Sequence, residues 1–126
     1  MNTISRETRN ELEQVVIDAL NDGYNGEVSE LHHRCFNEDY FIIGHYQAEE
    51  WLKKNYGIFA AIEKIKDYEQ DNFGEVTTDL SQAENVVNML VYILGEELLA
   101  DIDAVSDNWD KEVTPEIAAA IIAELS

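Results

Sequence analysis

The segment of residues 81–94 constrains the fold most, because it joins a helix start to apolar residues on every side. Ser81 and Glu84 have the spacing of a capping box, in which each side chain accepts a hydrogen bond from the other residue's backbone amide. Apolar residues then fill eight of the nine positions from 86 to 94, with only Asn88 among them. A helix that is apolar all round has to be contacted on several sides. We therefore expect a central helix, continued by a narrower apolar stripe as far as Val105.

Five further segments carry helical signals and have to surround this central helix. The first begins with Ser5 as its cap and stops at Gly23, and the last begins at Thr114, with Pro115 in its first turn. Three more helical patterns cover residues 29–36, 47–54 and 58–69. In the third of these we expect an inner stripe that consists of Ile58, Phe59, Ile62 and Ile65.

Two short runs rich in aromatic or β-branched residues, 40–43 and 75–78, have the composition of strands. They could pair with each other, although an irregular buried segment explains the first run nearly as well, and two strands alone are marginal. The chain of 126 residues has the usual length of one domain. We predict a mainly α fold over residues 1–126, a compact single-domain bundle of five or six helices with at most one short two-stranded β element.

Acidic residues dominate the charge and are unevenly placed. The chain has 27 Asp and Glu against 8 Lys and Arg, a formal net charge of −19. Twelve of the acids, and no Lys or Arg, lie between Asp67 and Asp110. A field of this sign repels nucleic acid and anionic membrane surfaces and attracts basic partners. We therefore expect a basic protein partner, no direct binding of nucleic acid and no membrane association.

The single cysteine and the N-terminal residues are typical of a cytoplasmic protein. Cys35 has no second cysteine with which to form a disulfide, as is common in reducing compartments. The first ten residues lack the apolar stretch of a signal peptide, and the longest apolar run, near residues 86–94, is too short to span a bilayer. We interpret Cys35 as a small buried hydrophobic residue.

His32, His33 and Cys35 are the candidates for a metal site or a nucleophile. His32 and Cys35 are three residues apart and can share a helix face, which leaves a zinc site open, but adjacent histidines point about 100° apart and rarely bind one ion. A cysteine nucleophile with a histidine base is disfavoured, because acidic surroundings raise the pKa of a thiol. We predict no metal, no cofactor, no catalytic residue and no enzymatic activity.

Other motifs for chemistry fit poorly or do not occur. EF-hand registers that start at Asp101 or Asp67 place Ser106 or Asn72 at the position that requires glycine. The signatures of dinucleotide-binding loops, phosphate-binding loops, α/β-hydrolases and zinc proteases are missing from the sequence. The carboxylates themselves are therefore the feature that remains to be explained.

The spacing of some of these carboxylates has two interpretations. Glu63, Asp67 and Asp71 lie four residues apart, provided that their helix extends so far. Such neighbours are about 6 Å apart, a separation comparable to that of adjacent phosphates along a nucleic-acid strand. Glu97 and Asp101 repeat the relation on the central helix. The row is either a solvated face that keeps the protein soluble or a mimic of a nucleic-acid backbone.

Two blocks of the sequence resemble a known class of protein. LHHRCFNEDYFIIGHYQAEEWL (residues 31–52) and DNFGEVTTDLSQAENVVNMLVYILGEELL (residues 71–99) are similar to a family of small acidic proteins of unassigned function that phages and other mobile elements encode. The resemblance brings no catalytic residues. It implies a phage setting, in which small acidic proteins often inhibit host nucleases, restriction enzymes or CRISPR effectors.

We therefore predict an acidic inhibitor that mimics nucleic acid and occupies the basic groove of a host nucleic-acid-binding defence enzyme, such as a CRISPR effector or a restriction nuclease. The expected partner-binding face consists of Asp67, Glu69, Asp71, Glu75, Asp79, Glu96, Glu97, Asp101 and Asp103. One alternative is an oligomeric structural or assembly protein, for instance a homodimer, with Trp51, Trp109 and the final helix at its interface. The other is a small metal-dependent enzyme.

Overall fold

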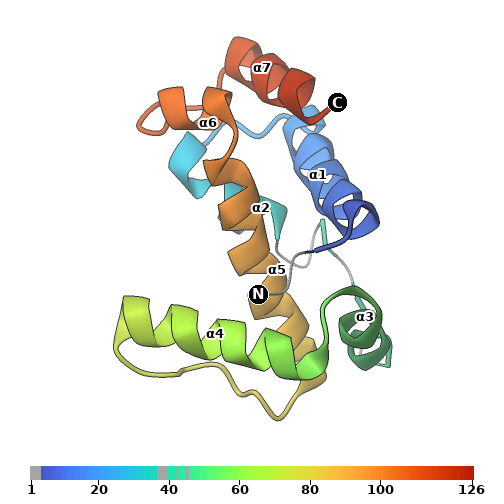
Figure 1. Cartoon of the computed structure of the whole chain (residues 1–126). Coiled ribbons are helices and arrows are strands. Elements are labelled where there is room, and N and C mark those ends of the chain that lie inside the picture. The colour runs from blue at the N-terminus through green and yellow to red at the C-terminus, as the bar shows by residue number, and fades with distance from the viewer. Residues whose placement is uncertain (1–3, 37–39, 42, 45) are drawn as a thin grey trace.

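The computed structural model describes residues 4–36, 40–41, 43–44 and 46–126, and this part of the chain is mainly α-helical. It contains seven α-helices and one short 3-10 helix, η1. Their bounds are α1 Arg6–Asn21, η1 Val28–Glu30, α2 Leu31–Cys35, α3 Ala48–Asn55, α4 Ile58–Phe73, α5 Ala83–Ala100, α6 Asp103–Asp107 and α7 Pro115–Leu125. The helices form a compact bundle (Figure 1), which confirms the predicted mainly α fold class, with seven α-helices in the described residues instead of the expected five or six.

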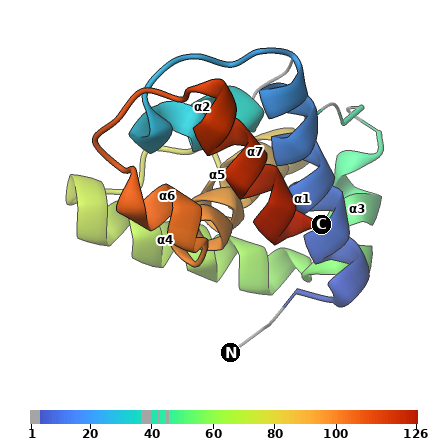
Figure 2. The same cartoon turned by 90° about the horizontal axis from the view of Figure 1, so that it is seen from above.

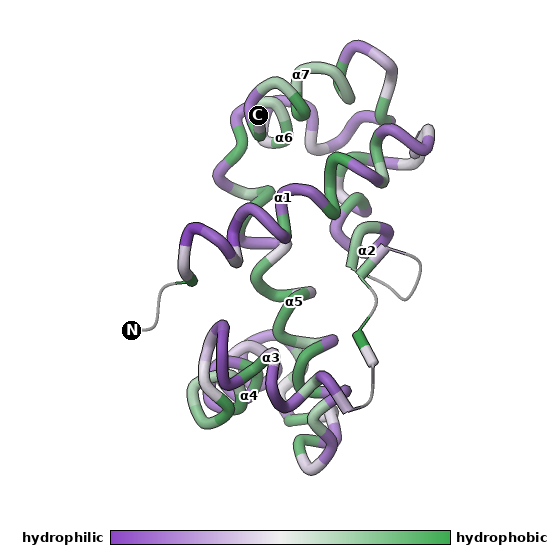
Figure 3. Tube along the Cα trace, turned by 90° about the vertical axis from the view of Figure 1, so that its right-hand side faces the viewer, coloured by the Kyte–Doolittle hydropathy of each residue, from purple (hydrophilic) through white to green (hydrophobic). Residues whose placement is uncertain are grey.

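Helix α5 is the centre of this bundle. It contacts α2, α3, α4 and α6, and Val87, Leu90 and Val91 are completely buried. Its trace is mostly hydrophobic along its length, whereas α1 and α4 alternate between hydrophilic and hydrophobic residues (Figure 3). The expectation of a central helix contacted on several sides is confirmed, and the reason is the apolar composition of its whole circumference.

Four of the remaining helices lie at the two ends of α5, and α2 packs beside its length (Figure 1). Helix α4 crosses the end where α5 begins, with α3 beside it, and α6 and α7 lie at the other end (Figure 1). Viewed from above, α7 lies next to α1 (Figure 2), which it contacts. Within the described residues, no helix is long and apolar enough to cross a membrane.

Three helix boundaries follow the local signals in the sequence. The Ser5 hydroxyl oxygen accepts a hydrogen bond from the backbone N–H of Thr8, and Gly23 adopts a positive φ of 91° after the end of α1. The Thr114 hydroxyl oxygen accepts from the backbone N–H of Ile117, with Pro115 as the first helical residue of α7. These caps satisfy orphan donors within one turn, so neighbouring residues are enough to define them.

The capping box predicted at Ser81 is wrong. Helix α5 begins at Ala83, and Gln82, at its N-cap, makes no side-chain cap. The Ser81 hydroxyl and backbone N–H both donate to Asp79 Oδ1, at 2.6 and 3.0 Å. The Asp79 carboxylate therefore accepts from the Ser81 backbone N–H, the donor that a capping box assigns to the Glu84 carboxylate.

The two-stranded β element, which the sequence left open beside an irregular segment, does not form within the described residues. The part of the chain that the structure describes contains no strand, only an isolated bridge between Glu27 and Glu112. The backbone N–H groups of Thr77 and Thr78 donate to the Glu69 carboxylate instead of to a partner strand. Residue 42, in the middle of the other predicted strand, lies outside the described residues.

A third correction concerns the end of the central helix, which was expected to carry its apolar stripe to Val105. Helix α5 ends at Ala100, and Ile102 adopts an extended conformation, with φ −91° and ψ 118°, before α6 begins at Asp103. Both Ile102 and Val105 are still buried. The buried apolar stripe is thus divided between two consecutive helices, α5 and α6.

Gly95 allows α2 and α5 to approach each other. A Cβ atom added at Gly95 would overlap the ring of Phe36, which directly follows α2. Both residues belong to the buried part of the protein. A glycine inside a helix costs about 1 kcal/mol relative to alanine, and here the close contact explains why it is present.

We predict that Gly95→Ala lowers the free energy of unfolding by about 1–3 kcal/mol, because overpacking outweighs the gain in helix propensity. Urea unfolding followed by circular dichroism measures the change. In a Phe36→Leu background the penalty should shrink, since the smaller side chain leaves room for the methyl group. A Gly95→Ala variant that is more stable than the original protein would contradict this packing.

Candidate partner-binding site

An exposed stripe on α4 carries an aromatic residue followed by three carboxylates. Phe59, Glu63, Asp67 and Asp71 are spaced four residues apart, and α4 extends to Phe73, so that all four lie on one helix. The carboxylate row was predicted on the condition that this helix extends to Asp71, and α4 meets that condition. We call these four residues the α4 stripe.

The exposure of Phe59 corrects the predicted inner stripe. Its side chain is 77% exposed, whereas the buried residues of α4 are Ala61, Ile65 and Glu69. These three also follow a spacing of four, displaced around the helix from the α4 stripe. The apolar residue type suggested that Phe59 faces inward, but the buried face of α4 ends in a carboxylate that the sequence pattern did not reveal.

A shallow groove between α4 and α5 brings the stripe next to the central helix. The groove has a volume of about 510 Å³. It is lined by Tyr56, Phe59, Ala60, Glu63, Lys64, Asp67, Tyr68, Asp71, Ile93 and Glu97. Three of the nine predicted face residues, Asp67, Asp71 and Glu97, are thus brought together in one place.

Two lysines reduce the negative charge of this groove. Lys64 Nζ lies 2.7 Å from Glu97 Oε1 and links α4 to α5, and Lys66 Nζ lies 3.7 Å from Glu63 Oε1. Asp67 and Asp71 are exposed and form no ion pair with any residue that the structure describes. The unneutralised charge of the groove is therefore concentrated on these two aspartates.

Glu69 does not belong to the predicted acidic face. Only 1% of its surface is exposed, and its two carboxylate oxygens accept four hydrogen bonds. The backbone N–H groups of Thr77 and Thr78 donate to Oε1, both at 3.0 Å, and their hydroxyl groups donate to Oε2, at 3.2 and 2.7 Å. The carboxylate anchors the loop between α4 and α5 and is not accessible to a partner.

The pKa of Glu69 follows from this arrangement. Burial alone would raise it, but the hydrogen bonds from Thr78 and Thr77 outweigh burial and lower the pKa from its ordinary value of 4.5. The group is therefore ionised at neutral pH although it is buried. Its charge is stabilised by the loop that it holds.

Glu96 is directed partly into the protein. Its Oε2 accepts a hydrogen bond of 2.8 Å from the Tyr68 hydroxyl and lies 3.9 Å from His32 Nε2. Burial, with the hydroxyl–carboxylate contact as the next cause, raises the pKa of Tyr68 well above its ordinary range. Glu96 therefore links α5 to α4 and α2, and 40% of its side chain stays exposed beside these contacts.

The other four predicted face residues lie away from the groove. Glu75 and Asp79 are exposed in the loop that joins α4 to α5, and Asp79 is held by its hydrogen bonds from Ser81. Asp101 is the C-cap residue of α5, and Asp103 is in the first turn of α6. A negative charge in a first turn is stabilised by the helix dipole. The nine residues are thus spread over several parts of the protein and do not form one continuous face.

His32, His33 and Cys35 have structural contacts. Cys35 is completely buried, as expected, and burial raises its pKa to about 12, so the thiol is protonated at neutral pH. Burial, together with His33, lowers the pKa of His32. His33 Nε2 lies 3.2 Å from the Tyr92 hydroxyl oxygen. Among the described residues, no group of three or more His, Cys, Asp or Glu has a geometry that could hold a metal ion.

The two tryptophans named for an oligomer interface differ in their surroundings. Trp51 is half-buried between α1 and the segment at Phe41, while Trp109 is 41% exposed. In the final helix, Ile121 is completely buried against the protein's own core. These residues therefore do not share one exposed apolar face.

Sequence reasoning missed two features of this site, the position of Phe59 and the ion pair between Lys64 and Glu97. The spacing of four between Phe59 and Glu63 was the available signal for the first. The second depends on how α4 crosses α5, which no local pattern encodes. In comparisons with protein-family models, curated proteins and solved structures, none matches the chain.

We predict that Glu69→Gln lowers the free energy of unfolding at pH 7 by about 1–2 kcal/mol, because hydrogen bonds to a charged acceptor are lost. A carboxyl group whose pKa is lowered by folding stabilises the protein fully at a pH above the pKa of the unfolded state. This stabilisation is lost as the pH falls through the pKa of the folded state. The difference between the two proteins should therefore shrink below about pH 4.5. Urea unfolding at a series of pH values measures it.

Glu75→Gln is the matched control for this prediction. Glu75 is exposed in the loop that Glu69 anchors, so its replacement removes the same charge without a buried carboxylate. Its effect on stability should be within about 0.5 kcal/mol. If Glu69→Gln changed stability no more than Glu75→Gln at pH 7, the anchoring role of Glu69 would be refuted.

Proposed function

We propose that this protein acts stoichiometrically, as an acidic inhibitor that inserts the α4 stripe into the basic groove of a nucleic-acid-binding enzyme. The observation that carries the proposal is the row of Glu63, Asp67 and Asp71 on one rigid helix, with two unneutralised aspartates at its end. Nucleic-acid-binding grooves carry Lys and Arg at the positions of phosphates. Carboxylates at intervals of about 6 Å suit such a groove.

The rigidity of the scaffold supports this proposal. Helix α4 contacts α5, its residues Ala61 and Ile65 are completely buried, and the Glu69 anchor holds the loop at its end. A partner therefore does not have to order these carboxylates when it binds, and preorganised groups bind with a smaller loss of entropy. A disordered acidic tail of the same charge would lack this advantage.

An exposed aromatic residue stands at the start of the row. Phe59 is 77% exposed, lies four residues before Glu63 and lines the same groove as the carboxylates. Aromatic side chains stack on bases and on arginine guanidinium groups in nucleic-acid-binding sites. Together with the carboxylates, Phe59 gives the stripe both the charge and an apolar contact of the kind that a nucleic-acid strand offers.

The phage setting belongs to the same proposal and rests on the sequence resemblance alone. In that setting the partner is a CRISPR effector or a restriction nuclease of the host cytoplasm. The oligomeric assembly protein is less well supported by the geometry, because Trp51 is half-buried and Ile121 packs inward. The metal-dependent enzyme lacks a ligand cluster within the described part of the chain.

The test is capture from a bacterial lysate followed by a competition assay with each captured nucleic-acid-binding protein. We predict that one equivalent of this protein displaces labelled DNA or RNA from its partner, and that Asp67→Asn with Asp71→Asn weakens the displacement about tenfold or more. Affinity should fall steeply between about 0.1 and 0.5 M salt, because the Debye length shortens.

Asp107→Asn with Asp110→Asn is the matched control, since it removes the same charge from exposed residues of α6 and the following turn. This control should displace nucleic acid almost as well as the original protein. Equal loss in the two double variants would show that net charge alone acts. Displacement that survives the Asp67 and Asp71 changes at all salt concentrations would overturn the proposal.

A further inference from the structure

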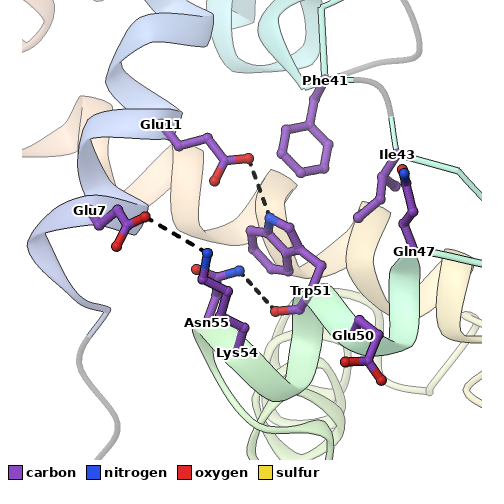
Figure 4. Close-up of a pocket in the computed structure, with 9 residues that line it drawn as sticks. All are labelled: Glu7, Glu11, Phe41, Ile43, Gln47, Glu50, Trp51, Lys54 and Asn55. Carbon is purple, nitrogen blue, oxygen red and sulfur yellow. Dashed lines mark hydrogen bonds and ion pairs between the residues drawn. The ribbon is translucent and has the colours of Figure 1, made fainter.

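A pocket between α1 and α3 combines aromatic walls with a carboxylate rim. It has a volume of about 410 Å³ and differs in every lining residue from the groove on α4. Its lining residues are Glu7, Glu11, Phe41, Ile43, Gln47, Glu50, Trp51, Lys54 and Asn55 (Figure 4). The inference drawn from it is therefore independent of the proposed function.

The aromatic wall of this pocket is held in place from two sides. The Trp51 indole Nε1–H donates to Glu11 Oε1 at 3.3 Å, and the Phe41 ring stands edge-on to the indole at 84°, with centroids 5.8 Å apart. Asn55 Nδ2 donates to the Trp51 carbonyl at 2.9 Å, and Asn55 Oδ1 accepts from the Thr8 hydroxyl of α1 at 2.6 Å. The last contact ties α3 to α1, the two helices that carry most of the pocket.

The charge of the rim is negative. Glu7, Glu11 and Glu50 contribute three carboxylates, and Lys54 contributes the one cation among the residues that line the pocket. Lys54 Nζ lies 3.8 Å from Glu7 Oε1 on the α1 side. Figure 4 shows the Glu11 carboxylate directed toward the Trp51 indole and Glu50 at the outer edge of the pocket. A ligand over the indole would thus meet the Glu11 carboxylate, with Glu50 at the outer edge.

We propose that this pocket binds a guanidinium group, as carried by an arginine side chain. A guanidinium is planar and weakly hydrated, stacks on aromatic faces, and presents five N–H donors to carboxylates. An anion would meet three carboxylates and one lysine that is already paired. A bare metal ion would need several oxygens that converge on one point, and no such cluster occurs in the described residues. A compact ammonium can also lie over an indole face, but it is more strongly hydrated than a guanidinium and has fewer donors for the carboxylates.

Tryptophan fluorescence provides the test. In a Trp109→Phe background Trp51 is the single tryptophan, and arginine amide is titrated at constant ionic strength. We expect a saturable change in emission, and a response at least tenfold weaker to citrulline amide, which has nearly the same shape but no charge. An equal response to the two compounds, or a change that sodium chloride reproduces, would overturn the proposal.

Glu50→Gln and Glu49→Gln are the matched pair of variants. Both residues are exposed, both lie on α3 and both pair with Lys53, at 4.0 and 3.2 Å, but only Glu50 lines the pocket. Glu50→Gln should weaken the binding of arginine amide about threefold to fivefold, and Glu49→Gln should leave it unchanged. An equal effect of the two substitutions would show that arginine amide responds to the general field of the protein, which would refute a built site.

A blocked Gly-Arg-Gly peptide distinguishes the two sources of a guanidinium. Binding as tight as that of arginine amide would identify the arginine side chain of a partner protein as the ligand. Binding of arginine amide alone would identify a small free molecule, because the pocket would then exclude a peptide backbone. Absence of binding by both compounds would reject the guanidinium site.

Discussion

The burial of α5 on all sides is the constraint on which the rest of the structure depends. A helix with Val87, Leu90 and Val91 completely buried needs neighbours around its whole circumference. Short helices supply them: α2, α3 and α6 contact α5, and the longer α4 crosses its first half. The core has to offset the mutual repulsion of a surface with a net charge of −19. Of the helices that contact α5, α4 and α6 present exposed aspartates to the solvent, whereas α2 contains no acidic residue.

Local chemistry explains which parts of the fold could be predicted from the sequence. The caps at Ser5 and Thr114 depend on donors within one turn, and the apolar circumference of α5 depends on composition alone. The capping box predicted at Ser81 does not form although its signal is equally local, because the Asp79 carboxylate accepts from the backbone N–H that the box assigns to Glu84. A sequence pattern names the groups that can form a bond. It does not rank two acceptors that compete for one donor.

The candidate site was predictable only in part, because exposure and pairing depend on how helices cross. Asp67 and Asp71 follow from helical spacing, whereas the link between Lys64 and Glu97 exists only because α4 lies across α5. Phe59 was assigned to the core from its residue type, but the orientation of α4 buries Ala61 and Ile65 and leaves Phe59 77% exposed. Residue type predicts the average burial of a side chain. Whether one particular side chain is buried depends on how its helix crosses the neighbouring helix.

Helix α4 shows why the net charge alone says little about function. Glu69 and Asp67 are only two residues apart, yet one carboxylate is buried with four hydrogen bonds and the other is exposed without an ion pair among the described residues. The difference lies in the donors that Thr77 and Thr78 supply on the inner side. The buried carboxylate stabilises the helix and loop, and the exposed ones need no internal partner. A partner's cations can therefore bind the exposed carboxylates without disrupting a contact on which the fold depends.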